Sequence, residues 1–203
     1  MSEPRIGRLL VASLHQSIAD ELPDRLEFYE NWLSPTGLRE GRIGLAPLSA
    51  VLSFLRREGT AYDDVTSRAG RYAAQWTVRN VPATKRRLVR MLPAWWRIRS
   101  ALQVVRELVR TTYPGSRVIV RVKRGTASVE LRGSLFCEVR EASALPLCGF
   151  YRAAIVEVLQ AFGIEARAQV IECRASGARR GCAMTVALGP RPEALSKVPE
   201  NAA

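Results

Sequence analysis

Apolar residues in the first half of the chain recur every three or four positions, which is the spacing of a helix with one buried face. The clearest case runs from Ile6 to Leu22. The same spacing predicts four further helices: Arg25 to Leu33, Leu48 to Arg57, Tyr62 to Val78 and Trp95 to Thr112. The turn residues Ser34-Pro35-Thr36-Gly37 predict a loop over 35–45, and Pro82 and Pro93 mark breaks where no helix is predicted.

The pattern changes to alternation after Tyr113-Pro114-Gly115, a strong turn signal. Apolar residues at every second position are typical of half-buried strands. We predict two strands joined at Arg124-Gly125, a third over Ser134 to Arg140, an apolar helix from Leu147 to Phe162, and a hairpin of Ala166 to Arg174 with Cys182 to Leu188. Helices followed by consecutive strands indicate an α+β fold. We expect N-terminal helices packed on an antiparallel sheet of about five strands, with one buried helix in the C-terminal half.

The chain has 203 residues, of which 47% are hydrophobic, and this suits a single domain with its own core. We expect a helical part over 1–114, a sheet with the buried helix over 115–188, and a flexible tail over 189–203, which lacks apolar periodicity. The start, MSEPRIGRLL, lacks the features of a secretory signal, and no apolar run approaches the roughly 20 residues of a bilayer span. We therefore expect a cytoplasmic protein, or one that is peripheral at a membrane.

The formal net charge of +12 predicts an anionic partner. Thirteen basic residues and one acid, Glu107, lie between Arg79 and Arg124, so this segment carries as much net charge as the whole chain. It also holds two tryptophans, and tryptophan beside arginine is typical of a bilayer interface. The residues expected at an anion- or membrane-facing surface are Lys85, Arg86, Arg87, Arg90, Trp95, Trp96 and Arg97.

Two other interpretations of this basic segment stay open. It can be a solvated helix whose tryptophans belong to the core. Nucleic-acid binding ranks lowest, because the sequence has neither a helix-turn-helix motif nor an aromatic RNA-binding motif.

Motifs of catalysis are missing from the sequence. It has no Gly-rich phosphate loop, no Gly-x-Ser-x-Gly elbow and no metalloprotease helix. The single histidine, His15, is far in sequence from any cysteine or serine that it could activate. The sequence therefore favours a binding protein over an enzyme.

All four cysteines fall in the last third of the chain. Cys148 stands at the start of a predicted helix, where the helix dipole favours a thiolate. Cys173 and Cys182 lie near the facing ends of the predicted hairpin, and Cys137 lies on the predicted third strand. Three thiolates with a fourth ligand would form a closed, structural zinc site. The alternative is that all four are buried thiols of an ordinary core.

The cysteines lie in three distinctive segments that flank the apolar helix ending at Gly163. These are Leu147-Cys148-Gly149-Phe150-Tyr151, Val170-Ile171-Glu172-Cys173-Arg174-Ala175-Ser176-Gly177 and Gly181-Cys182-Ala183-Met184. Over residues 134–188 this pattern resembles the 4-vinyl reductase domain family, which includes bacteriochlorophyll-associated proteins, aromatic-sensing domains of transcription activators and relatives of a TRAPP tethering subunit. The helical part of the chain is similar only in layout.

The resemblance implies a pocket for an apolar small molecule or acyl chain between the helices and the sheet, and a homodimer. On the helix over 147–162 we expect Phe150, Ala154, Val158 and Phe162 to line that pocket. In this interpretation the protein is a non-catalytic binding or carrier protein. A peripheral membrane or tethering protein that uses the basic, tryptophan-bearing segment is the alternative. The sequence does not indicate which ligand is bound.

The resemblance also implies a zinc ion held by the cysteines that match Cys148, Cys173 and Cys182. Two features depart from the family pattern: the interval between the last two cysteines is one residue longer, and Val170 stands where an acidic ligand is expected. Neighbouring residues of a strand point to opposite faces, so Glu172 should face away from Cys173. Cys137 is therefore the better candidate for the fourth ligand.

Overall fold

The computed structural model describes residues 6–33, 44–139 and 142–189. In these ranges the helices are α1 (Arg8–Glu21), α2 (Leu26–Glu30), α4 (Leu45–Leu55), α5 (Ala61–Arg79), α6 (Ala83–Met91), α7 (Ala94–Thr112) and α8 (Gly149–Ala161). The strands are β1 (Arg117–Lys123), β2 (Thr126–Arg132), β3 (Ala166–Glu172) and β4 (Cys182–Leu188). Short 3-10 turns are η1 (Pro23–Arg25), η2 (Arg56–Glu58), η3 (Leu135–Cys137) and η4 (Arg174–Ser176).

The predicted α+β class is confirmed. Most of the loop expected over 35–45, and all of the tail after Gly189, lie outside the described residues.

Helix α6 was not predicted from the sequence. Pro82 and Pro93 are the N-cap residues of α6 and α7, so both prolines precede helices instead of separating loops. The only buried residue of α6 is Val89. A helix that buries one side chain carries too little apolar periodicity to be recognised from its sequence.

The third predicted strand, Ser134 to Arg140, is wrong. Its described part holds the single turn η3, in which Leu135, Phe136 and Cys137 are all buried. Three consecutive buried residues do not fit a strand with one covered face, where burial alternates. Among the described residues the sheet consequently has four strands instead of about five, in the order β1-β2-β4-β3 with every pair antiparallel.

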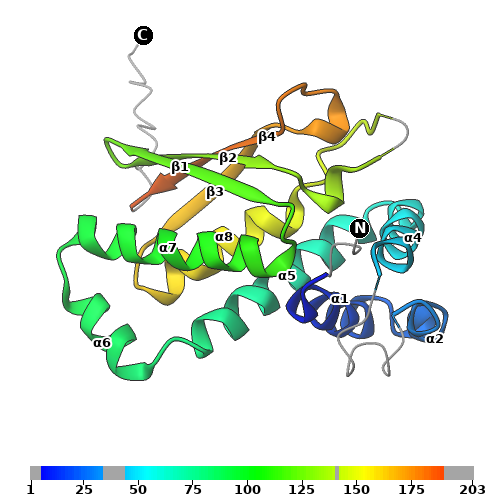
Figure 1. Ribbon diagram of the computed structural model, residues 1–203, viewed down its shortest axis with the longest axis horizontal. Helices are drawn as coiled ribbons and strands as arrows, with labels where there is room; N and C mark the ends of the chain where they lie inside the picture. The colour runs from blue at the N-terminus through cyan, green and yellow to red at the C-terminus, as the bar shows by residue number, and fades with distance from the viewer. Residues whose placement is uncertain (1–5, 34–43, 140–141, 190–203) are drawn as a thin grey trace, which may run out of the picture.

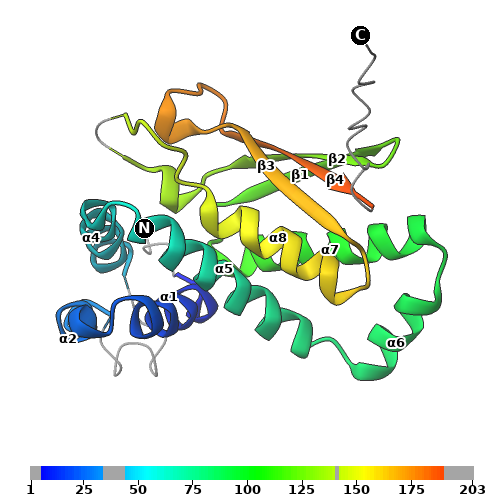
Figure 2. The ribbon, with the colours of Figure 1, turned by 180° about the vertical axis from the view of Figure 1, so that it is seen from behind.

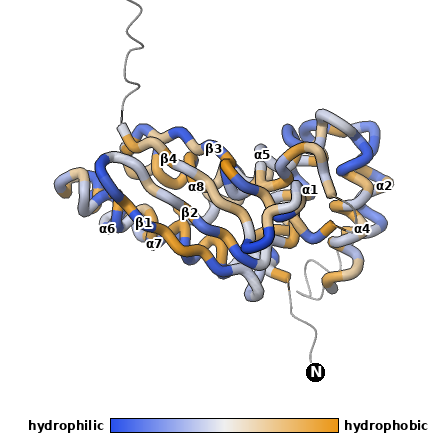
Figure 3. The backbone as a smooth tube through the Cα atoms, turned by 90° about the horizontal axis from the view of Figure 1, so that it is seen from above, coloured by the Kyte–Doolittle hydropathy of each residue, from blue (hydrophilic) through white to orange (hydrophobic). Residues whose placement is uncertain are grey.

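The sheet is apolar on one face only. Cross-strand pairs such as Val129 with Met184 and Leu131 with Cys182 are buried, whereas the neighbouring pair Ser128 with Thr185 is exposed. Helices α7 and α8 lie against the covered face, and α5 and α1 lie beyond them (Figures 1 and 2). Seen from above the sheet, α6 lies at one end of the molecule and α2 and α4 at the other (Figure 3).

The most deeply embedded helix is α8, and the predicted buried helix is thus confirmed. Every described position from Gly149 to Phe162 except Gln160 is at least half-buried. Its two charged side chains pair with α5: Arg152 with Asp63 at 2.9 Å, and Glu157 with Gln75 at 3.0 Å. These contacts give partners to the polar side chains of α8 where it faces α5.

The helices α5 and α8 cross at Gly70. A Cβ atom at this position would overlap the backbone carbonyl of Phe150, so only glycine permits the observed approach. The crossing thereby joins the N-terminal helices to the helix that carries Cys148.

We predict that Gly70→Ala lowers the free energy of unfolding by about 1–3 kcal/mol, because the added methyl group forces the two backbones apart in a close-packed core. Chemical denaturation measures the change. Arg71→Ala is the control, since Arg71 is the next residue and is exposed. Equal stability of the two variants would contradict the close approach.

Candidate metal centre and neighbouring cleft

Four cysteines from separate pieces of the chain meet in the core. Cys137 ends η3, Cys148 is the N-cap residue of α8, Cys173 follows β3, and Cys182 begins β4. All four side chains are buried. Burial of α8 against the sheet brings the start of this helix to the end of the β3–β4 hairpin, and the turn after β2 brings Cys137 to the same point.

The four sulfur atoms lie within 4.8 Å of one another. The Sγ of Cys137 is 3.3 Å from Cys148, 3.6 Å from Cys173 and 3.4 Å from Cys182, and Cys148 and Cys173 are 3.3 Å apart. These separations exceed the roughly 2.05 Å of a disulfide bond, and the thiols are free. Four sulfur ligands at about 2.3 Å from a tetrahedral ion would be about 3.8 Å apart. The cluster is therefore compatible with one structural metal ion after small side-chain shifts.

Backbone amides support negative charge on two of the sulfur atoms. The N–H of Leu147 donates to Cys173 Sγ at 3.4 Å, and the N–H of Arg174 donates to Cys182 Sγ at 3.5 Å. Hydrogen bonds from the Cys137 and Cys148 thiols, together with the Leu147 amide, lower the pKa of Cys173. Hydrogen bonds with Cys137 and Cys173, with burial, raise the pKa of Cys148. The helix start therefore does not by itself make Cys148 a thiolate.

Cys137 supplies the fourth sulfur atom of the cluster. Cys137 belongs to the cluster, whereas Glu172 is exposed beside a register irregularity in β3. Val170 is half-buried and offers no ligand atom. The four sulfurs thus form a complete set of donors without a carboxylate.

A cleft of about 1360 Å³ adjoins the cluster. One wall is the segment between Cys137 and Cys148, which contributes Leu145 and Leu147; the facing wall comes from α4, η2 and the start of α5, and the far end reaches Ala168 and Val170 of β3. The lining is mixed, with apolar side chains from the segment and from β3 and charged side chains from the helices.

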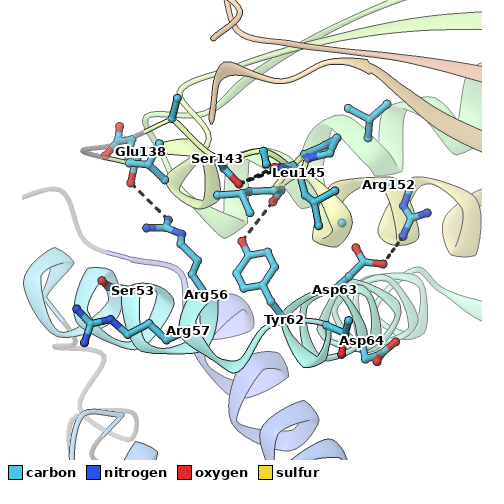
Figure 4. A pocket seen from close by; sticks show the side chains of 18 of the residues that line it. Ser53, Arg56, Arg57, Tyr62, Asp63, Asp64, Glu138, Ser143, Leu145 and Arg152 are labelled. Atoms are coloured by element: carbon cyan, nitrogen blue, oxygen red, sulfur yellow. Dashed lines mark hydrogen bonds and ion pairs between the residues drawn. The ribbon is translucent and has the colours of Figure 1, made fainter. Parts of the chain in front are cut away.

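Three polar side chains bridge the cleft (Figure 4). Arg56 donates to the carbonyl oxygens of Phe136 at 3.0 Å and Glu138 at 3.4 Å, and Tyr62 donates to the carbonyl oxygen of Leu147 at 3.4 Å. Burial raises the pKa of Tyr62, which keeps its hydroxyl protonated as a donor. Arg152 points to Asp63. The contacts of Arg56 and Tyr62 hold the two described ends of the chain between Cys137 and Cys148, and the Arg152–Asp63 pair joins α8 to α5.

The residues expected to line a pocket on α8 have different positions. Phe150, Ala154 and Val158 are buried in the core. Phe162 lines a smaller pocket of about 510 Å³ between α5, α6 and α7. Sequence reasoning missed the cleft residues Arg56, Tyr62 and Arg152, because nothing in a helical repeat distinguishes a residue that faces a cleft from one that faces solvent.

The basic segment divides into exposed and engaged side chains. Lys85, Arg87, Trp95 and Trp96 are exposed, and Arg86 and Arg97 are half-buried. Arg90 donates two hydrogen bonds to the carbonyl oxygen of Ala161, at 3.1 and 2.7 Å, and so caps the C-terminus of α8.

His15 is half-buried and lies 2.8 Å from Glu30, which makes it a link between α1 and α2. Within the described residues, no helix combines the length and the apolar character needed to cross a membrane.

In comparisons with known proteins, the sequence matches no family model and none of the curated proteins. The resemblance to 4-vinyl reductase domains therefore stays a prediction, and the function has to be argued from the cysteine cluster and the cleft.

Proposed function

We propose that the protein is a small-molecule-binding module whose ligand cleft is held in shape by a zinc ion bound to four cysteine thiolates. The observation that carries the proposal is the position of residues 138–139 and 142–147, the described part of the chain between Cys137 and Cys148. Cysteines of the cluster stand at both of its ends, and its side chains form a wall of the cleft.

The donor set supports zinc. Four thiolates in a tetrahedral arrangement are typical of zinc or of iron, and a closed set without an open position is typical of a structural site. Thiolates repel one another in a buried site. A divalent cation offsets this repulsion with its positive charge, and it favours loss of the protons of the thiols that coordinate it. The amides of Leu147 and Arg174 add hydrogen bonds to the sulfurs, as the outer contacts of metal sites commonly do.

The cleft supports a ligand with a mainly apolar body. Leu145, Leu147, Ala168 and Val170 supply apolar surface, and burying such surface favours binding by about 25 cal/mol per Å². Among the polar side chains that line the cleft, Arg56 and Tyr62 donate to backbone carbonyls and Arg152 pairs with Asp63. A ligand would therefore gain most of its affinity from the apolar walls, with a few polar contacts setting its orientation. The proposal includes no catalytic step.

We predict about one zinc ion per chain in protein purified without chelator. Cys182→Ser should lose this zinc and lower the free energy of unfolding by several kcal/mol, because metal binding contributes directly to folding. Elemental analysis and thermal unfolding measure both effects. Met184→Leu is the matched control, since Met184 is buried on the same face of β4 and is not in the cluster. Iron in place of zinc would overturn the choice of metal, and metal-free protein with full stability would overturn the metal site.

We predict that Ala168→Trp weakens ligand binding at least about tenfold, because an indole would occupy apolar space at the far end of the cleft. Arg167→Trp is the matched control: Arg167 is the preceding residue of β3, is exposed and does not line the cleft. Binding is measured with labelled fatty acids and aromatic compounds, and metal content is measured alongside.

Native mass spectrometry of the wild type reports bound metal, bound ligand and the expected homodimer in one spectrum. Unchanged zinc in both variants, with binding lost only in Ala168→Trp, would support a separate ligand site beside the metal. Equal binding by the two variants, or a wild type that binds none of the probes, would contradict the cleft as a ligand site.

A further inference from the structure

The corner between α6 and α7 exposes a dense group of large apolar side chains. Leu88 is 63% exposed, Met91 79%, Trp95 56% and Trp96 44%. These four residues fall within nine positions of the sequence, on either side of the junction between α6 and α7. Single exposed apolar residues are normal, but a contiguous group with a charged border marks an interaction site.

The corner is a protruding part of the fold. It lies at the end of the molecule opposite α2 and α4 (Figures 1 and 3). Leu88 and Met91 are three positions apart in α6, so they share one side of that helix. The rings of Trp95 and Trp96 stack with centroids 4.0 Å apart. The internal contacts of Arg90 with α8 hold α6 in place and leave these apolar side chains directed away from the core.

Every charged side chain of α6, and of α7 up to Arg106, is basic. Lys85, Arg87 and Arg99 are exposed and Arg86 is half-buried. The sequence contains no Asp or Glu between Asp64 and Glu107, a stretch that covers all of α6 and most of α7. A surface with uncompensated positive charge attracts anions, and the attraction is greatest where no acid lies nearby.

We infer that the corner formed by α6 and the start of α7 docks on an anionic lipid bilayer. Leu88, Met91 and the two tryptophans would enter the interfacial layer, where tryptophan is enriched, and the exposed basic side chains would contact lipid phosphates. Arg90 is a positioning residue in this proposal, because its guanidinium is committed to the end of α8.

The apolar group distinguishes a bilayer from a nucleic acid. Phosphate contacts require the basic side chains alone, so exposed Leu88 and Met91 would have no role on a duplex. Bases can stack on aromatic side chains, but each indole of the Trp95–Trp96 pair already covers one face of the other. A bilayer uses the basic and the apolar residues together.

The first experiment measures binding to vesicles of phosphatidylcholine alone and of phosphatidylcholine mixed with phosphatidylserine. We expect binding to the mixed vesicles only, weakening as salt is raised. Neutralising Lys85, Arg86 and Arg87 to Gln should lower the partition coefficient on the order of a hundredfold, given the contribution of each basic residue near an anionic surface. The matched control is the same change at Arg117, Arg121 and Lys123 of β1, which removes equal charge elsewhere.

The second experiment tests the apolar group. Leu88→Ser with Met91→Ser, and Trp95→Ala with Trp96→Ala, should each lower binding to mixed vesicles about tenfold or more, while binding to heparin is unchanged. Ile119→Ser with Val122→Ser is the control, because these two residues are the exposed apolar side chains of β1. Circular dichroism and thermal unfolding verify that each variant is folded.

Several results would overturn the inference. If the α6 and β1 charge variants lost vesicle binding equally, the binding would depend on net charge and not on the corner. If both double variants of the apolar residues bound vesicles as well as the wild type does, the corner would not be the docking surface. Tighter binding to duplex DNA than to mixed vesicles at physiological salt, lost in the Lys85, Arg86 and Arg87 variant, would assign the corner to nucleic acid instead.

Discussion

Burial of α8 on nearly every side is the constraint on which the other features depend. A helix of this composition is stable only with a layer on each face, and the sheet and α5 provide those layers. The close crossing at Gly70 brings α5 onto it, and the pairs Arg152–Asp63 and Gln75–Glu157 satisfy its polar groups. The N-terminus of α8 then carries Cys148 into the cysteine cluster, and its C-terminus accepts the guanidinium of Arg90.

The two ends of α8 thus lead to two different surfaces. At its start, the cluster joins η3, the β3–β4 hairpin and the segment that lines the cleft. The chain between Cys137 and Cys148 has no helix or strand among its described residues to hold it in place. The four sulfurs, joined by hydrogen bonds or by a metal ion, supply that support. At its end, Arg90 fastens α6, which has one buried residue and little other attachment. The cleft and the corner lie at opposite ends of one rigid helix. A substitution at one of these surfaces can therefore leave the other unchanged.

The cleft and the α6–α7 corner differ in charge. The cleft contains acids and bases that pair or approach one another, such as Arg152 with Asp63, and it has no strong bias toward anions. The α6–α7 corner has bases without acids. An apolar ligand for the cleft and an anionic surface for the corner are therefore compatible within one protein, and a carrier that exchanges its ligand at a membrane would combine them.

The α+β class, the positions of α1, α5, α7, α8 and both hairpins, and the concentration of positive charge could all be predicted from the sequence. These features follow from periodicity, turn residues and composition, which are local. The sequence also singled out the four cysteines, because their clustering in the last third of the chain is a compositional signal. Their convergence depended on packing: Cys137 reaches the cluster from a 3-10 turn, where alternation alone predicted a strand.

Which polar residues meet, and which apolar residues remain uncovered, depends on how the helices and the sheet pack and could not be predicted from the sequence. Arg56 and Tyr62 donate to the carbonyl oxygens of Phe136, Glu138 and Leu147 across more than seventy sequence positions, and no local pattern predicts contacts over such a separation. Phe150, Ala154 and Val158 are core residues and not cleft residues, since the side of α8 that they occupy is covered. The same physical reason applies to Leu88 and Met91. Their exposure depends on the position of α6 in the fold and on which side of this helix other elements cover.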